Sequence, residues 1–253
     1  MNKNGKLKAR RQGLLRAIGL SFVFLLTMMN AGLADEARDK IFAERARAAW
    51  QSARNQFQSN TNDPVLAWQF ARTCFDYADL SPEKRAAIAQ EGIAACSHSL
   101  TLADSAGAHY YLALNLGELA QTEDLGALKL VREMAREFEA TAALDKKFDF
   151  AGPERGLGLL SRDAPGWPVS VGSRRKAREY LESAATLAPG DPENILNLAE
   201  TCLKWGDKTE AKKELDVLGD LWPKAQKNFT GQAWEQSWDD WSKRRDVLRE
   251  KLD

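Results

Sequence analysis

Identical residues recur at an interval of 34 in the C-terminal part of this chain. Five pairs share the interval: Ala177 and Ala211, Leu181 and Leu215, Leu187 and Leu221, Pro189 and Pro223, and Asn194 and Asn228. The prolines follow stretches with a helical pattern, and proline is a common signal for the end of a helix. A unit of this length is too short to bury its own apolar face, so we predict helix pairs that stack on one another.

A helix pair of this length that ends in proline is typical of the tetratricopeptide repeat. We therefore predict an all-α fold, a tetratricopeptide-like helical solenoid of about four helix pairs with one inserted loop. Asp63-Pro64, Ser81-Pro82 and Asp191-Pro192 each place a capping side chain before a proline, which predicts three helix starts. Stacked repeats present a groove to a partner, so we expect binding rather than catalysis.

The chain divides into four predicted segments. They are a signal peptide at 1–34, an N-terminal helix at 35–62, a repeat domain at 63–223 with an insertion at 149–172, and a C-terminal capping helix at 224–253. Within the insertion we expect a short helix near 152–161. The last segment carries five apolar residues on one helical face, namely Trp234, Trp238, Trp241, Leu248 and Leu252. We expect this face to cover the end of the solenoid, with a homo-oligomer interface as the alternative.

The first 34 residues have the layout of an export signal. Six basic residues and no acidic one precede an apolar run over 17–29. Gly32-Leu33-Ala34 then places small residues at the positions that a signal peptidase reads. We expect cleavage after Ala34 and a periplasmic chain that is soluble afterwards. An uncleaved membrane anchor is the alternative, although the apolar run is shorter than the roughly 20 residues of a typical span.

Removal of the leader would make the chain acidic. The sequence has 36 basic and 36 acidic residues, and the loss of six basic ones leaves 30 against 36. An acidic surface argues against nucleic acid as a partner.

Catalytic and metal-binding patterns are missing from the sequence. His98 and His109 have no metal-ligand spacing, and no acid, base and nucleophile set stands out. We therefore expect no enzyme, no metal and no cofactor. Cys74 and Cys96 lie on consecutive expected helices and could form a disulfide, or all three cysteines, including Cys202, could be small buried apolar residues.

Four segments carry a resemblance to a known family: His109 to Gly117, the Gly-Pro-x-Arg-x-Leu-Gly run at 152–158, the Ala-Pro-Gly-Trp-Pro loop at 164–172, and Asn194 to Glu200. Over roughly Trp68 to Pro223 the chain resembles the TRAP transporter T-component family, whose relatives include the regulator-of-microtubule-dynamics proteins. The resemblance implies a helical periplasmic accessory protein that pairs with a substrate-binding protein and holds an apolar ligand in a cleft. It implies no catalysis.

Eight residues are candidates for ligand or partner binding: Tyr110, Tyr111, Asn115, Arg155, Leu157, Trp167, Asn197 and Glu200. Arg155 either ties the insertion to helix ends or to Glu200, or grips a ligand carboxylate. Trp167 is either a wedge that locks the loop onto helices or a wall of an apolar pocket.

The leading functional hypothesis is an exported accessory component of TRAP-type solute uptake that handles an apolar or carboxylate-bearing ligand. The alternative is a general scaffold for protein–protein interaction in the cell envelope.

Overall fold

The computed structural model describes residues 35–123 and 126–252, so the predicted signal peptide lies outside the described residues. The chain divides into two compact units, Met1–Arg45 and Ala46–Asp253. A helix covers residues 35–59, and the boundary between the units falls inside it.

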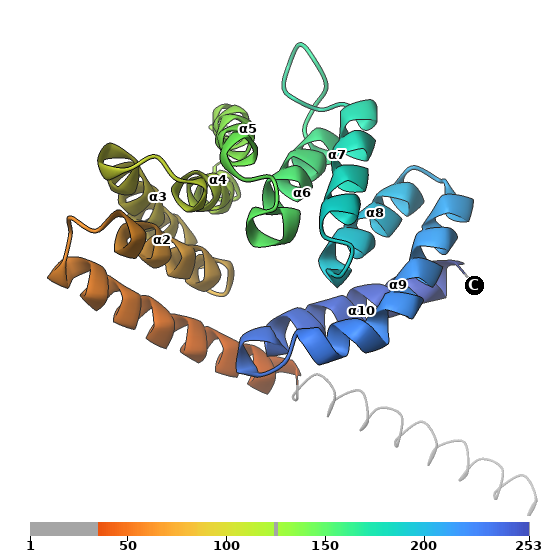
Figure 1. Cartoon of the computed structure of the whole chain (residues 1–253), viewed down its shortest axis with the longest axis horizontal. Helices are drawn as coiled ribbons and strands as arrows, with labels where there is room; N and C mark the ends of the chain where they lie inside the picture. The colour runs from red at the N-terminus through yellow and green to blue at the C-terminus, as the bar shows by residue number, and fades with distance from the viewer. Residues whose placement is uncertain (1–34, 124–125, 253) are drawn as a thin grey trace, which may run out of the picture. The chain divides into compact units, whose positions relative to one another are not determined.

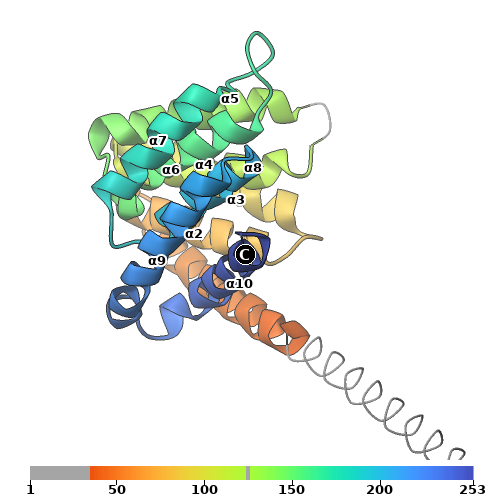
Figure 2. The ribbon, with the colours of Figure 1, turned by 90° about the vertical axis from the view of Figure 1, so that its right-hand side faces the viewer.

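The second unit continues with a series of α-helices and one short 3-10 helix (Figure 1). The elements are α2 (Pro64–Asp79), α3 (Arg85–Leu102), α4 (Ala106–Ala120), α5 (Ala127–Leu144), α6 (Phe148–Asp163), α7 (Arg174–Leu187), α8 (Pro192–Lys204), α9 (Lys208–Asn228), η1 (Gln232–Trp234) and α10 (Glu235–Leu252). Each of the helices α2 to α9 packs on the next one along the chain, and α10 packs on both α8 and α9 (Figure 2). No strand forms within 35–123 or 126–252, and the predicted all-α solenoid is confirmed.

Side-chain caps explain where several helices begin. Asp63 and Asp191 accept hydrogen bonds from backbone N–H groups of the first turns of α2 and α8, with proline at the first helical position. The third predicted start is wrong, because α3 begins at Arg85 and not beside Ser81-Pro82. The Ser81 carbonyl instead accepts from the Lys84 N–H at 2.9 Å, which closes a turn before the helix.

The 34-residue interval matches a structural repeat of α7 and α9. Their capping residues, Ser173 and Asp207, lie 34 apart, and each accepts a hydrogen bond from the N–H three residues on. Ala177 and Ala211 are fully buried at equivalent positions. The prediction of a repeat is therefore confirmed at the level of caps and core contacts.

Two predicted boundaries are wrong. The short helix expected near 152–161 is longer than predicted, because residues 148–163 form α6, which packs between α5 and α7. The loop of the insertion is confined to 164–173. Pro223 does not end its helix, since α9 continues to Asn228 and the C-terminal helix starts at Glu235. Proline removes only one intrahelical hydrogen bond, and five more residues continue the helix beyond it, with Trp222 and Ala225 in the core.

The apolar face of α10 covers the end of the repeat array, as predicted. Trp241 and Leu248 are buried in a cluster with Leu218 and Trp222 of α9, and Trp238 packs at its edge. The Trp222 and Trp238 rings lie 5.1 Å apart, edge to face. The tryptophans of α10 therefore have an intramolecular role that does not need an oligomer.

Cys74, Cys96 and Cys202 are free and buried, which supports their interpretation as small apolar residues. No helix among the described residues is long and apolar enough to cross a membrane.

Candidate functional site

A surface depression of about 490 Å³ lies along the first half of α7. Seven residues line it: Arg174, Arg175, Arg178, Glu179, Glu182, Trp205 and Asp207. It is open to solvent and belongs to the repeat that the 34-residue interval defines.

An aromatic ring and fixed charges shape this depression. The guanidinium carbons of Arg174 and Arg178 lie 5.3 Å and 5.8 Å from the centre of the Trp205 ring, which is the range of a cation–π contact. Arg178 also lies 3.5 Å from Asp207, the N-cap of α9. Arg175 forms an ion pair with Glu179 at 2.6 Å. The guanidinium groups of Arg174 and Arg178 thus lie over the partly buried indole of Trp205.

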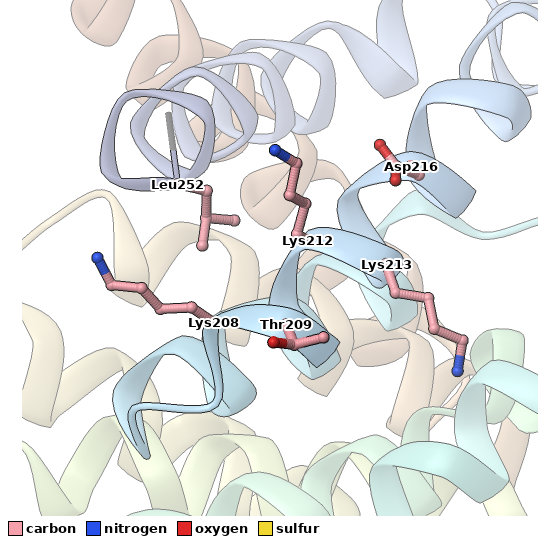
Figure 3. A pocket seen from close by; sticks show the side chains of 6 residues that line it. All are labelled: Lys208, Thr209, Lys212, Lys213, Asp216 and Leu252. Atoms are coloured by element: carbon pink, nitrogen blue, oxygen red, sulfur yellow. The ribbon is translucent and has the colours of Figure 1, made fainter.

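A second depression of about 430 Å³ lies along the first half of α9 (Figure 3). Its lining residues are Lys208, Thr209, Lys212, Lys213, Asp216 and Leu252. Figure 3 shows the side chains of Lys208 and Lys212 on either side of Leu252, which comes from the end of α10. The second depression therefore also combines cationic heads with one apolar side chain.

The two depressions are copies of each other in the repeat. Every residue that α7 contributes to the first has a counterpart 34 positions on that lines the second: Arg174 and Lys208, Arg175 and Thr209, Arg178 and Lys212, Glu179 and Lys213, and Glu182 and Asp216. The first and fifth of these helical positions are basic in both copies, and the ninth is acidic in both. The solenoid thus repeats a charged surface as well as a core.

The net charge differs between the copies. Three arginines and three carboxylates line the first, whereas three lysines and one carboxylate, Asp216, line the second. A hydrogen bond from Lys213 to Glu210, and the charge of that carboxylate, raise the pKa of the Lys213 ammonium, which keeps it cationic. The second depression therefore favours negatively charged groups.

Three of the residues predicted to bind a ligand form part of the core of the second unit. Tyr110, Tyr111 and Asn115 of α4 are buried. The Asn115 amide donates to the carbonyls of Ala71 at 2.9 Å and Tyr111 at 2.7 Å, so it joins α4 to α2. These side chains contribute to packing, and a binding role for them stays a prediction. The same holds for Leu157, buried in the same cluster.

Arg155 ties α6 to the start of α8. Its guanidinium lies 3.3 Å from the capping carboxylate Asp191 and 3.0 Å from Asn194 Oδ1. It also donates to the carbonyls of Asp149 and Phe150. The predicted tie to a helix end is confirmed, whereas the predicted tie to Glu200 is wrong.

Glu200 and Asn197 lie on α8 and bind Arg244 of α10. Arg244 donates to both oxygens of Glu200 at 2.8 Å and 2.9 Å, and to Asn197 Oδ1 at 2.7 Å. It also bonds to Glu193, whose second partner is the Trp241 indole. The polar stripe of α8 thus fixes the capping helix.

Trp167 is 89% exposed at the tip of the loop between α6 and α7. The interpretation of Trp167 as a wedge that locks the loop onto helices is wrong, whereas its role as a wall of an apolar pocket stays a prediction.

The residues of the two depressions were not predicted as a site. The interval of 34 was recognised from pairs of identical residues, whereas Arg174 with Lys208 and Arg178 with Lys212 keep the same interval with basic residues that are not identical. Basic residues that recur at the same 34-residue interval as the core residues are the sequence signal that identifies this surface. Within the described ranges no group of three or more His, Cys, Asp or Glu side chains could hold a metal ion.

The tetratricopeptide repeat family matches residues 170–226, which include α7, α8 and most of α9. The match covers the repeat formed by α7, α8 and most of α9, and the fold of the described residues is an all-α, tetratricopeptide-like helical-repeat solenoid. No curated protein matches the sequence.

Two solved structures are similar at 16% identity and a TM-score of 0.49. One is the crystal structure of MamA, with 69% of this chain and 87% of that chain covered. The other is a crystal structure of MamA protein, with 77% and 95% covered.

Proposed function

We propose that this protein is a scaffold for protein–protein interaction that binds a partner along the first halves of α7 and α9. The observation that carries the proposal is the repetition of one charged depression at equivalent positions of two successive repeats. Helical repeats commonly bind partners through surfaces that run across several units.

The chemistry of the depressions favours an acidic protein segment. Lys208 and Lys212 supply cationic heads beside Leu252, and Arg174 and Arg178 supply them beside Trp205. Each copy therefore offers one apolar contact beside cationic side chains, with an excess of positive charge in the second copy only. A segment that carries carboxylates next to apolar side chains would satisfy both copies.

Site-specific crosslinking tests the proposal. A photoreactive amino acid at Thr209 or at Glu179 should capture one and the same protein in native cells. The matched control places it at Lys227, an exposed position near the other end of α9. Equal capture at all three positions would contradict a specific surface.

The captured partner then allows a charge test. Lys212→Glu should weaken its binding at least tenfold, while Lys227→Glu should leave binding unchanged, because a reversed charge in the depression repels acidic groups. An affinity for the Lys212→Glu variant equal to that of the parent would refute the assigned surface.

A narrower proposal is that the partner is a substrate-binding protein of a TRAP-type uptake system and that the scaffold carries an apolar ligand. Only the sequence resemblance supports it, while the family match supports the broader scaffold. Native mass spectrometry of the purified chain would test it, since a retained small apolar molecule supports uptake and an empty chain does not. Export to the periplasm is likewise a proposal, tested by cell fractionation. The same spectra give the stoichiometry and decide whether a homo-oligomer forms.

A further inference from the structure

The loop at 164–173 is held in one shape. The Gly172 N–H donates to the Pro165 carbonyl at 2.9 Å, and the Ser173 N–H donates to the Ser161 carbonyl at 2.8 Å. A side chain at Gly172 would overlap the Ala164 carbonyl, so the two arms of the loop approach as closely as glycine allows. Figures 1 and 2 show the loop projecting beyond the ends of α6 and α7.

The tip of this loop is apolar and exposed to solvent. Trp167 is the most exposed large apolar side chain of the described residues, and Val169 is 49% exposed. Pro165 and Pro168 are exposed beside them. Such a group of apolar side chains, held out by a fixed backbone, marks a contact site.

Basic side chains flank the tip. Arg132 of α5 donates to the Val169 carbonyl at 2.5 Å, which fixes α5 beside the loop. Lys129 and Arg136 lie three and four residues from Arg132 and therefore share its face of α5, and both are exposed. Lys176 is exposed in the first turn of α7, directly after the loop.

The carboxylate at the base of the loop does not cancel this charge. Asp163 accepts from Arg162 and from Lys204, each at 2.6 Å, so it is outnumbered by its own partners. These bonds lower the pKa of Asp163 although burial opposes them. The basic residues named here outnumber the carboxylates near them, which are Asp163 and, on α5, Glu133 and Glu139.

We propose that the loop docks this protein on an anionic lipid surface, with Trp167 in the interface and the basic side chains of α5 and α7 against the headgroups. Tryptophan prefers the level of the headgroups, because one part of its ring system is apolar and its N–H can bond to polar groups. Basic residues near the surface add attraction to anionic lipid. Trp167 lines neither depression, so its replacement tests this docking without changing a residue of the proposed scaffold surface.

Vesicle sedimentation tests the proposal. The chain from residue 35 to 253 is mixed with vesicles of phosphatidylcholine alone or of phosphatidylcholine with phosphatidylglycerol. We expect sedimentation with the anionic vesicles, weakened by high salt. Trp167→Ala should lower the partition coefficient about tenfold or more. Val217→Ala, at an exposed apolar position of α9, is the matched control and should leave it unchanged.

A second variant tests the charges. Lys129→Gln combined with Arg136→Gln should lower partitioning about fivefold for each charge removed and leave the loop bond of Arg132 in place. Absence of sedimentation with anionic vesicles would overturn the proposal. So would equal sedimentation of the parent and Trp167→Ala, or Trp167-dependent binding to a protein without any binding to vesicles. Trp167 is exposed, so circular dichroism should confirm that the variant folds.

Discussion

Three consecutive residues before the body of α6 have left-handed backbone angles. Asp149, Phe150 and Ala151 have φ values of 48°, 54° and 62°. None is a glycine, and such angles cost free energy for other residues. Arg155 and Asn194 both bind the Phe150 carbonyl, and the Tyr110 hydroxyl donates to Asp149 at 2.7 Å. The buried polar groups therefore hold the turn in place.

Replacement of Arg155 should destabilise the protein strongly. Arg155→Met removes the cation that Asp191 and the turn carbonyls share, so we expect the free energy of unfolding to fall by about 3 to 5 kcal/mol. Arg47→Met, at an exposed position, should change it by less than about 0.5 kcal/mol. Urea unfolding followed by circular dichroism measures both. A small loss for Arg155→Met would mean that the turn does not depend on its charge.

Glu118 makes stability depend on pH. Burial, together with the charge of Asp79, raises the pKa of Glu118 to about 7, although Arg85 opposes the shift. The folded chain then binds the proton more tightly than the unfolded chain. The stability that protonated Glu118 provides is present at low pH and is lost as the pH rises from about 4.5 to 7.

Glu118→Gln should flatten this part of the pH profile, as measured by thermal unfolding between pH 4.5 and 7.5. Some slope should remain, because burial also raises the pKa of Asp76 and of Asp191 to about 6. Glu250→Gln, at an exposed position of α10, serves as the control. Profiles that coincide for the parent and Glu118→Gln would show that Glu118 titrates alike in both states.

At the scale of elements, close helix approach depends on particular glycines. A side chain at Gly92 of α3 would overlap Asn115 of α4, whose amide joins α4 to α2. Gly219 of α9, by contrast, has no neighbour within 4 Å. Glycine is thus required for close helix packing at position 92, whereas at position 219 a side chain would meet no other atom.

This difference predicts opposite effects of one substitution. Gly92→Ala should lower the free energy of unfolding by about 1 to 3 kcal/mol through overpacking. Gly219→Ala should raise it by about 0.5 to 1 kcal/mol, because alanine favours the helix. Paired denaturant titrations give both values. Equal effects at the two positions would mean that α3 and α4 can move apart without cost.

At the scale of the whole molecule, the sequence was most informative where residues that recur at the 34-residue interval are also buried in the core. Ala177 and Ala211 predicted the repeat because close packing constrains both copies in the same way. The helix within the insertion was predicted too short, because glycine and proline in this segment argue locally against a helix. Gly156 nevertheless packs under Phe138, and its small size permits that contact. Tertiary contacts determine the conformation of these residues, and local sequence patterns do not reveal such contacts.

Removal of the last helix tests the integrity of the array. A chain that ends at Gly231 loses Trp241 and Leu248 and leaves Leu218 and Trp222 of α9 uncovered. We expect self-association, detected by light scattering after size-exclusion chromatography, because a large exposed apolar face promotes it. The chain from 35 to 253 is the reference. A monomeric, folded truncated chain would show that α10 is not needed as a cap.

Two copies of one depression on a single chain also affect how a bound partner leaves. When one segment of the partner detaches, the other still holds it at a high effective concentration near the vacant copy, so rebinding competes with escape. Each contact can then be weak and quickly reversible while the complex persists. A competitor that fits one copy could displace the partner stepwise, which a single deep pocket would not allow.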